Sequence, residues 1–154
     1  MLYFDNLEEL IFNRHKMFDV DQLIIISGFI GQSPVKKLET LPLSITVVYG
    51  MYPIDGVSKK LHEALVSQSN SSQNTNIRYS TYPVHSKIYA WLSNGKVVHA
   101  LIGSANFTSE RLLVPYKEVL VEATFDTFRP LENYIRMLVE NSIDCREGVA
   151  KHEN

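Results

Sequence analysis

The stretch Tyr82-Pro83-Val84-His85-Ser86-Lys87-Ile88-Tyr89-Ala90-Trp91 stands near the middle of the chain, and a second apolar run, Val97 to Ile102, follows it closely. Asn94-Gly95 separates the two runs, and this dipeptide between apolar segments predicts a β-hairpin. His85 and Lys87 are two positions apart, so their side chains would share one face of a strand. The hairpin would return the chain to the level of these two side chains.

The residues that follow the second run are Gly103-Ser104-Ala105-Asn106, which the hairpin brings near His85 and Lys87. An imidazole, an ammonium, a hydroxyl and a carboxamide would therefore converge on one point. This set suits a phosphate group, because it offers a nucleophile or acid, a positive charge and neutral hydrogen-bond donors. The pattern indicates a site for phosphoryl chemistry. An inactive domain that keeps the fold is the alternative.

His85-x-Lys87 followed by Gly103-Ser104-x-Asn106 resembles the signature of the phospholipase D superfamily. That signature usually carries an aspartate five positions after the lysine, where this chain has Leu92. The same departure occurs in a subgroup, the metal-independent restriction endonucleases of the BfiI and NgoFVII kind, which carry a glutamate shortly after the asparagine. Glu118 fits that position. The resemblance implies an α/β fold, a mixed β-sheet covered by helices on both faces.

The resemblance also implies hydrolysis of a phosphodiester through a covalent phosphohistidine intermediate. A neutral histidine attacks phosphorus, and a second, protonated histidine gives its proton to the leaving oxygen. Lys87 and Asn106 would hold the non-bridging oxygens, and Glu118 would orient His85. The residues expected at the site are His85, Lys87, Ser104, Asn106 and Glu118 for catalysis, and Gly103 and Ser27 for substrate binding.

This mechanism needs two histidines, but the His-x-Lys motif occurs once. The other histidines, His15, His62, His99 and His152, are not followed by a lysine two residues later. A symmetric homodimer with a shared active site at the two-fold axis is therefore expected, with one copy of His85 from each subunit. Repulsion between like charges would leave one proton on the pair, which makes one base and one acid.

The preferred function is a metal-independent DNA endonuclease, the catalytic domain of a type II restriction endonuclease. Two alternatives stay open. One is another phosphodiesterase or a phosphatidyltransferase of the phospholipase D type, and the other is an inactive dimerisation or binding module. No histidine, cysteine or carboxylate cluster has the spacing of metal ligands, so neither a metal nor another cofactor is expected.

Bulk composition is that of an ordinary globular chain of 154 residues, with 45% hydrophobic and 21% charged residues. One cysteine, Cys145, gives no disulfide framework and favours a cytoplasmic location. The N-terminus does not resemble a signal peptide, and no apolar run has the length of a membrane span, so no membrane partner is expected.

The formal net charge is −2, which is unusual for a domain that binds DNA without help. We therefore expect residues 1–154 to form a single catalytic domain. A further hypothesis is that this domain is a fragment of a longer protein that carries a separate DNA-recognition domain.

Alternating helices and strands support the α/β class. Leu23-Ile24-Ile25-Ile26 is apolar on both faces, as in a central strand of a covered sheet. The expected helices span 7–18, 34–41, 58–66 (or from 55) and 131–139, the expected strands span 22–29, 44–50, 77–82 and 118–125 besides the hairpin, and 67–76 is expected to be a polar loop.

Several local features carry more specific expectations. Asn6 with Glu9 resembles a capping box, and Ser33 is expected to cap the helix that begins at Pro34. Arg14-His15-Lys16 is expected to form a solvated helix face, with a DNA-facing patch as the alternative. Phe29 is expected to pack in the core rather than contact substrate, and a plain surface position is the alternative for Glu118.

Overall fold

The structure, a computed structural model, describes residues 1–112 and 117–152. These residues form an eight-stranded mixed sheet in the order β1-β7-β6-β5-β2-β3-β4-β8. The strands are β1 (Leu2–Tyr3), β2 (Gln22–Ser27), β3 (Ser44–Tyr49), β4 (Thr75–Ser80), β5 (Ile88–Ser93), β6 (Lys96–Gly103), β7 (Leu120–Glu122) and β8 (Ser142–Asp144). The α-helices are α1 (Leu7–Asn13), α2 (Gln32–Lys37), α3 (Tyr52–Asp55), α4 (Lys59–Ser71), α5 (Ser109–Leu112) and α6 (Phe125–Glu140).

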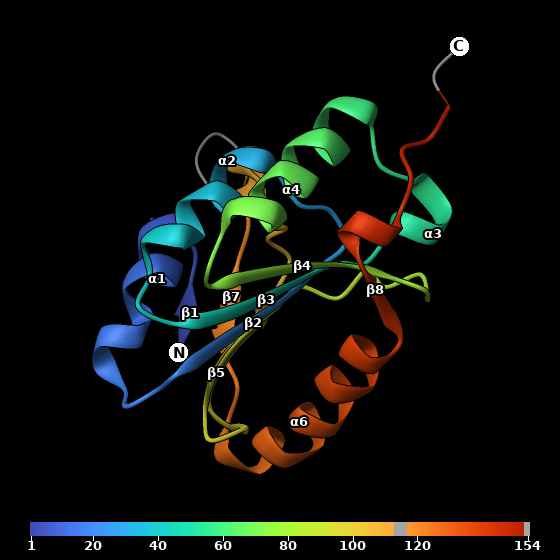
Figure 1. Ribbon diagram of the computed structural model, residues 1–154. Coiled ribbons are helices and arrows are strands. Elements are labelled where there is room, and N and C mark those ends of the chain that lie inside the picture. Colours follow the sequence, from blue (N-terminus) through green and yellow to red (C-terminus); the bar gives the residue numbers. More distant parts are fainter. Residues whose placement is uncertain (113–116, 153–154) are drawn as a thin grey trace.

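Helices cover both faces of the sheet, as Figure 1 shows: α1, α2 and α4 lie on one face and α6 lies on the other. The alternating side chains of β2 divide between the two cores that result. Leu23 and Ile25 join the larger core under α1, α2 and α4, whereas Ile24 and Ile26 join the smaller core under α6. The expected α/β fold, a mixed sheet covered on both faces, is confirmed.

The centre of the sheet follows from its apolar strands. β2 pairs in parallel with β3 and antiparallel with β5, and both neighbours are almost fully buried. The expected hairpin joins β5 to β6 through a two-residue loop in which Asn94 and Gly95 have φ values of 52° and 79°. These left-handed conformations define the hairpin turn that Asn-Gly favours. The hairpin prediction is therefore confirmed.

α1 begins at Leu7 as expected, but two expected helix caps are wrong. Asn6 adopts a left-handed conformation without a side-chain capping bond, so it does not form a capping box with Glu9. α2 begins at Gln32 after Gly31, which places Ser33 inside the helix rather than at its cap. The helix expected to start at Ser58 or Asp55 begins at Lys59, and Ser58 caps it by accepting a hydrogen bond from the Leu61 amide at 3.2 Å.

The expected polar loop at 67–76 is also wrong. α4 continues to Ser71, and β4 begins at Thr75. Gln68 explains the longer helix: its side chain is buried and donates a hydrogen bond to the Val35 carbonyl at 2.9 Å. Tertiary packing therefore overrides the weak helix propensity of a serine- and asparagine-rich segment.

The C-terminal third differs in its boundaries. β7 covers Leu120–Glu122 only, so Glu118 and Val119 precede it. α6 begins at Phe125, six residues before the expected start at Leu131, and contains Pro130. A further strand, β8, follows α6 and pairs with β4 at the edge of the sheet. Within the described residues, no helix is long and apolar enough to cross a membrane.

Arg14 is not part of a solvated helix face. α1 ends at Asn13, and Arg14 begins a 3-10 turn in which its side chain is only 8% exposed. Its guanidinium donates to His99 Nε2 at 2.9 Å and forms an ion pair with Glu122. Arg14 therefore belongs to a buried polar cluster, and neither expectation for it was correct.

Candidate active site

Segments that are distant in the sequence meet at one end of the sheet. β2 ends there at Ser27, β6 ends there at Gly103, and β5 and β7 begin there after Lys87 and Glu118. The direction of these neighbouring strands explains the arrangement, because β5 and β7 run antiparallel to β2 and β6. The structure thus places all seven of the predicted site residues at the same end of the sheet.

His85 and Lys87 lie in the extended segment just before β5. The Lys87 Nζ atom is 2.7 Å from His85 Nδ1, and it donates a hydrogen bond to the His85 carbonyl at 2.6 Å. Nζ also lies 3.2 Å from His85 Nε2, so the lysine amine stands against both ring nitrogens. The imidazole is exposed, while the lysine is only 7% exposed. An accessible ring therefore stands beside a nearly buried cation.

Burial lowers the pKa of the Lys87 ammonium, because desolvation penalises its charged form. The nearby Glu118 carboxylate opposes this shift, and the Arg111 guanidinium adds to it. A desolvated cation interacts strongly with an anion that binds beside it. Lys87 is thus suited to a phosphate oxygen, and the two neighbouring charges set its proton affinity.

Asn106 is fixed by the turn after β2. Its Oδ1 atom accepts a hydrogen bond from the Phe29 amide at 3.2 Å and lies 3.2 Å from Ser27 Oγ. Ser27 is fully buried, donates to the Phe29 carbonyl at 2.6 Å and accepts from the Phe107 amide at 2.9 Å. Since Oδ1 is occupied, the planar amide carries its N–H donors on the opposite arm. Ser27 is therefore enclosed in the turn whose Phe29 amide holds Asn106, and its hydroxyl does not face solvent.

Ser104 and Gly103 tie the loop after β6 to the start of β7. The Ser104 amide donates to the Val119 carbonyl at 3.0 Å, and Ser104 Oγ accepts from the Val119 amide at 3.0 Å. The Ser104 side chain is exposed, and its hydroxyl proton remains available for a ligand. A Cβ at position 103 would lie 2.1 Å from the Val119 carbonyl oxygen. A glycine is thus needed at position 103, because the backbone before β7 passes too close for any side chain.

Gly28 is a site residue that the sequence analysis missed. A Cβ there would lie 3.1 Å from His85 Cδ2 and 3.3 Å from Asn106 Oδ1. His85 and Asn106 therefore meet against the same bare backbone, where a side chain would crowd both. The Ser-Gly-Phe turn was visible in the sequence, but nothing in one sequence showed which side chains would approach its glycine.

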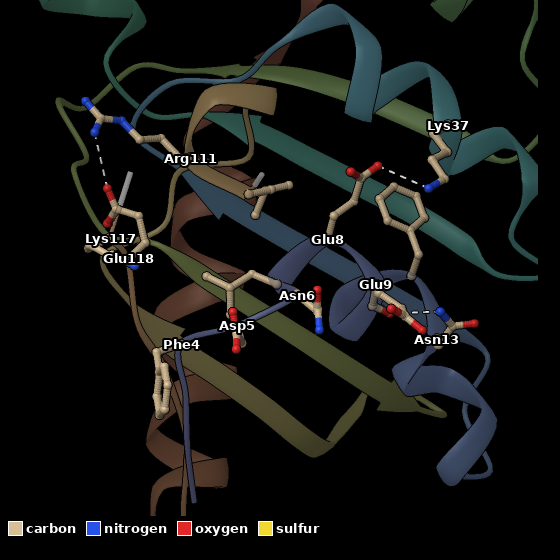
Figure 2. A pocket seen from close by; sticks show the side chains of 13 residues that line it. Phe4, Asp5, Asn6, Glu8, Glu9, Asn13, Lys37, Arg111, Lys117 and Glu118 are labelled. Carbon is tan, nitrogen blue, oxygen red and sulfur yellow. Dashed lines mark hydrogen bonds and ion pairs between the residues drawn. The ribbon is translucent and has the colours of Figure 1, made fainter. Parts of the chain in front are cut away.

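Glu118 forms an ion pair with Arg111 at 3.3 Å. Among the described residues it has no hydrogen bond to His85, so its contacts do not show the expected orienting role. Figure 2 shows the pair at one wall of a cleft of about 400 Å³, opposite Glu8 and Glu9 of α1. His85 and Lys87 are not among the described residues that line this cleft. The interaction of Glu118 with the site that the structure shows is electrostatic, since its carboxylate raises the pKa of Lys87.

The surroundings of position 92 explain why a leucine can replace the aspartate of the superfamily signature. Leu92 lies on β5 opposite Gln22, toward the far end of the strand from Lys87, and is 4% exposed in the core under α6. A carboxylate at this position would be buried among apolar side chains, at a high desolvation cost. The leucine fits this environment, which lies away from the site end of the sheet.

The described residues contain no group of three or more histidine, cysteine or carboxylate side chains that could hold a metal ion. The groups that converge at the sheet end are instead the exposed His85 imidazole, the buried Lys87 ammonium and the donors of Asn106 and Ser104. On a mixed sheet covered on both faces, this arrangement is that of a phospholipase D superfamily domain, as the family model that matches the chain also indicates.

The chain belongs to the family of the NgoFVII restriction endonuclease N-terminal PLD domain, whose model matches residues 5–150. No curated protein matches the chain. Among solved structures, NucT from Helicobacter pylori has 14% sequence identity and a TM-score of 0.68, and the match covers 94% of this chain and 97% of that chain. Nuc from Salmonella typhimurium has 12% identity and a TM-score of 0.63, with coverage of 94% and 95%. At these identities, the structural likeness concerns the fold.

Proposed function

We propose that this domain is a metal-independent DNA endonuclease that acts through a phosphohistidine intermediate, as the catalytic part of a type II restriction endonuclease. The observation that carries this proposal is the contact between an exposed His85 and a nearly buried Lys87, beside the anchored Asn106. Membership of a restriction endonuclease family supports DNA as the substrate.

The reaction proceeds in two displacements. An unprotonated ring nitrogen of His85 attacks phosphorus, so a P–N bond forms while the P–O bond to the leaving group breaks. A second histidine transfers a proton to that leaving oxygen. Water then attacks phosphorus, the P–N bond breaks, and the proton released by water returns to the second histidine. One water is consumed for each phosphodiester cleaved, and no oxidant or metal enters the balance.

Lys87 and Asn106 hold the non-bridging oxygens as charge shifts in the transition state. Both are preorganised: Lys87 by the His85 carbonyl and Asn106 by the Phe29 amide. When Lys87 turns from the imidazole to a phosphate oxygen, it leaves a ring nitrogen of His85 free for attack.

The second histidine comes from a second copy of the chain in this mechanism. The His-x-Lys motif occurs once, and His99 is buried in a different cluster, 5% exposed. A homodimer with both copies of His85 at its two-fold axis supplies the base and the acid. Identical residues then take different roles, because one proton is shared between them.

An exposed apolar surface offers a place for this second copy. Leu2 of β1 pairs with Val121 of β7, and Val119 lies beside Ser104 at the site end of the sheet. These three side chains and Phe4 are exposed large apolar groups. An apolar surface next to an incomplete site fits a partner subunit. Sedimentation should give twice the 17.6 kDa mass of one chain, and Val121→Asp should shift it to monomer.

In this proposal, the DNA sequence is recognised by a domain outside residues 1–154. The net charge of −2 provides little non-specific attraction to DNA, and the matching family model describes an N-terminal domain. The catalytic domain then supplies hydrolysis while another module selects the site. This division agrees with the absence of an identifiable base-reading element in the sequence.

Cleavage in EDTA tests the proposal. Supercoiled plasmid is incubated with the purified chain in excess EDTA, and His85→Ala purified in parallel controls for contaminating nucleases. The expected result is relaxed and linear plasmid with the wild-type chain and none with the variant. Activity that requires Mg²⁺ would contradict the mechanism. Release of phosphatidate from phospholipid without cleavage of DNA would assign the site to a lipid phosphodiester instead.

A further inference from the structure

Phe29 presents an aromatic ring to solvent at the edge of the candidate site. Its exposed fraction is 36%, whereas the neighbouring aromatic residues Tyr89 and Phe107 are fully buried. The ring centroid lies 6.4 Å from that of His85, with the ring planes at 85° to one another. The expectation that Phe29 packs in the core is therefore only partly met, since a third of its surface faces outward beside the imidazole.

The backbone of Phe29 is held on both sides. Its amide donates to Asn106 Oδ1 at 3.2 Å, and its carbonyl accepts from Ser27 Oγ at 2.6 Å. The next residues are fixed as well, because Ile30 forms a bridge with Phe107 and the Gly31 amide donates to the Phe107 carbonyl at 3.0 Å. A ring on such a backbone loses little freedom when a ligand stacks on it.

The inner edge of the ring is also supported. Its centroid lies 6.1 Å from that of Tyr49, with an interplanar angle of 48°. Gly28 adds no side chain beside Phe29 at the point where both His85 and Asn106 lie close to the backbone. The outward part of the ring is therefore an apolar surface of fixed orientation, immediately beside the position where a phosphate would bind.

We propose that Phe29 is a positioning residue that stacks against the nucleobase next to the scissile phosphate. This inference rests on the proposed nuclease function. A base is attached one sugar away from its phosphate, so a ring beside His85 is within reach of it. Aromatic stacking accepts any base, because every base has a π-face. Phe29 would thus favour nucleic acid over other phosphodiesters without reading sequence.

Two variants and one control separate stacking from other roles. Phe29→Leu keeps apolar bulk but removes the ring, while Phe29→Tyr keeps the ring. The backbone bonds of residue 29 do not involve its side chain, so both variants should fold. Phe125→Leu serves as the control, since Phe125 is 87% exposed and follows β7, whose other end carries the site.

The experiment compares kcat/KM for an oligothymidylate and for an abasic oligomer with the same number of phosphodiesters. The wild-type chain and Phe125→Leu should prefer the oligothymidylate by about 10- to 100-fold, the range expected for one stacked base. Phe29→Tyr should retain this preference, and Phe29→Leu should reduce the ratio to about one, mainly by losing activity on oligothymidylate.

Three results would overturn the role of Phe29. They are equal cleavage of both polymers by the wild-type chain, an unchanged preference in Phe29→Leu, and an equal loss on both polymers in that variant. The last result would mean that the ring only supports His85. Failure of the proposed function looks different: the wild-type chain would cleave neither polymer and would hydrolyse, at most, a small diester such as methyl p-nitrophenyl phosphate.

Discussion

Two polar clusters in this molecule contain the same kinds of side chain, yet their environments are opposite. The site cluster contains His85, Lys87 and Glu118. The buried cluster contains His99 with Arg14 and Glu122. Each combines an imidazole, a cation and a carboxylate. Residue types alone therefore do not identify the active site.

The buried cluster has satisfied its hydrogen bonds within the fold. His99 accepts from Arg14 and stacks on Phe18, with ring centroids 4.5 Å apart. Burial lowers the pKa of His99 to about 4, and the Arg14 charge adds to this effect. The Tyr3 hydroxyl accepts from Arg14 and donates to Glu122. This cluster joins β1, β6 and β7 to the turn after α1.

The site cluster differs because it keeps groups available to a ligand. His85 is exposed, the outward amide of Asn106 and the hydroxyl of Ser104 can still donate, and Lys87 is held by contacts within its own segment. The comparison teaches that exposure and unused hydrogen-bonding capacity distinguish a reactive cluster from a structural one. Reciprocal substitutions can test this distinction.

The largest difference is expected between the two histidines. His85→Ala should abolish cleavage in EDTA while the melting temperature stays close to that of the wild type, because an exposed ring contributes little to packing. His99→Ala should retain cleavage at a temperature where it is folded but lose about 2–3 kcal/mol of stability, because it removes the acceptor of the Arg14 Nε–H group and opens a cavity. The assignment of His85 to catalysis and His99 to structure would be contradicted if the His85→Ala variant cleaved DNA, or if the His99→Ala variant were inactive but as stable as the wild type.

A similar contrast is expected for the cations. Lys87→Ala should lose on the order of 10²-fold in kcat, as when other preorganised donors are removed, with little change in DNA affinity. Arg14→Ala should unfold more easily by about 3 kcal/mol, because it breaks a largely buried ion pair and its hydrogen bonds. Single-turnover kinetics and urea unfolding measure the two effects. Normal turnover by Lys87→Ala would make it a docking residue.

The pH dependence of cleavage should reveal how the charged neighbours of Lys87 set its pKa. Lys87 acts in its protonated form, and burial lowers its pKa, so activity should fall at a pH below the usual lysine value of about 10.4. Glu118 raises this pKa and Arg111 lowers it. In the pH–rate profile, Glu118→Gln should therefore move the alkaline loss of activity to lower pH, and Arg111→Gln should move it to higher pH.

A small phosphodiester substrate is suitable for this measurement, because it avoids alkaline melting of DNA. Methyl p-nitrophenyl phosphate allows kcat/KM to be followed across the alkaline range for the wild type and both variants. Shifts of the two variants in the same direction would contradict the charge arrangement around Lys87.

The buried cluster has its own pH dependence, with a smaller expected effect. The pKa of His99 is about 4 in the folded protein and about 6.5 in the unfolded chain. Between these values the unfolded state binds more protons, so stability should fall as the pH decreases from about 6.5 toward 4. His99→Gln keeps a polar side chain that does not titrate there. Urea unfolding should show a shallower decline for this variant, and parallel curves would contradict the assignment.

The sequence was most informative where one local pattern had one structural solution. The apolar residues 23–26 predicted a central strand, and Asn94-Gly95 predicted the hairpin that brings Asn106 near His85. The His-x-Lys motif was informative only together with the residues after the hairpin. The fold and the common position of the site residues could therefore be predicted.

Other features depend on contacts that no local pattern encodes. The segment after Val66 stays helical because Gln68 reaches the Val35 carbonyl, and Arg14 is buried because His99 and Glu122 meet it from other strands. The partner of Glu118 could not be predicted either, since Arg111 has no defined spacing from the motif. Such long-range partners determine which polar groups remain free.

Mixed dimers test the central claim most directly. Wild-type chains and His85→Ala chains with different affinity tags are co-expressed, and the heterodimer is isolated by tandem purification. A site on the two-fold axis would then contain one histidine and lack either the nucleophile or the acid. The account predicts at least about 10²-fold lower cleavage than the wild-type homodimer. A heterodimer with about half the wild-type activity would contradict the shared site, because each subunit would then act with its own complete set of residues.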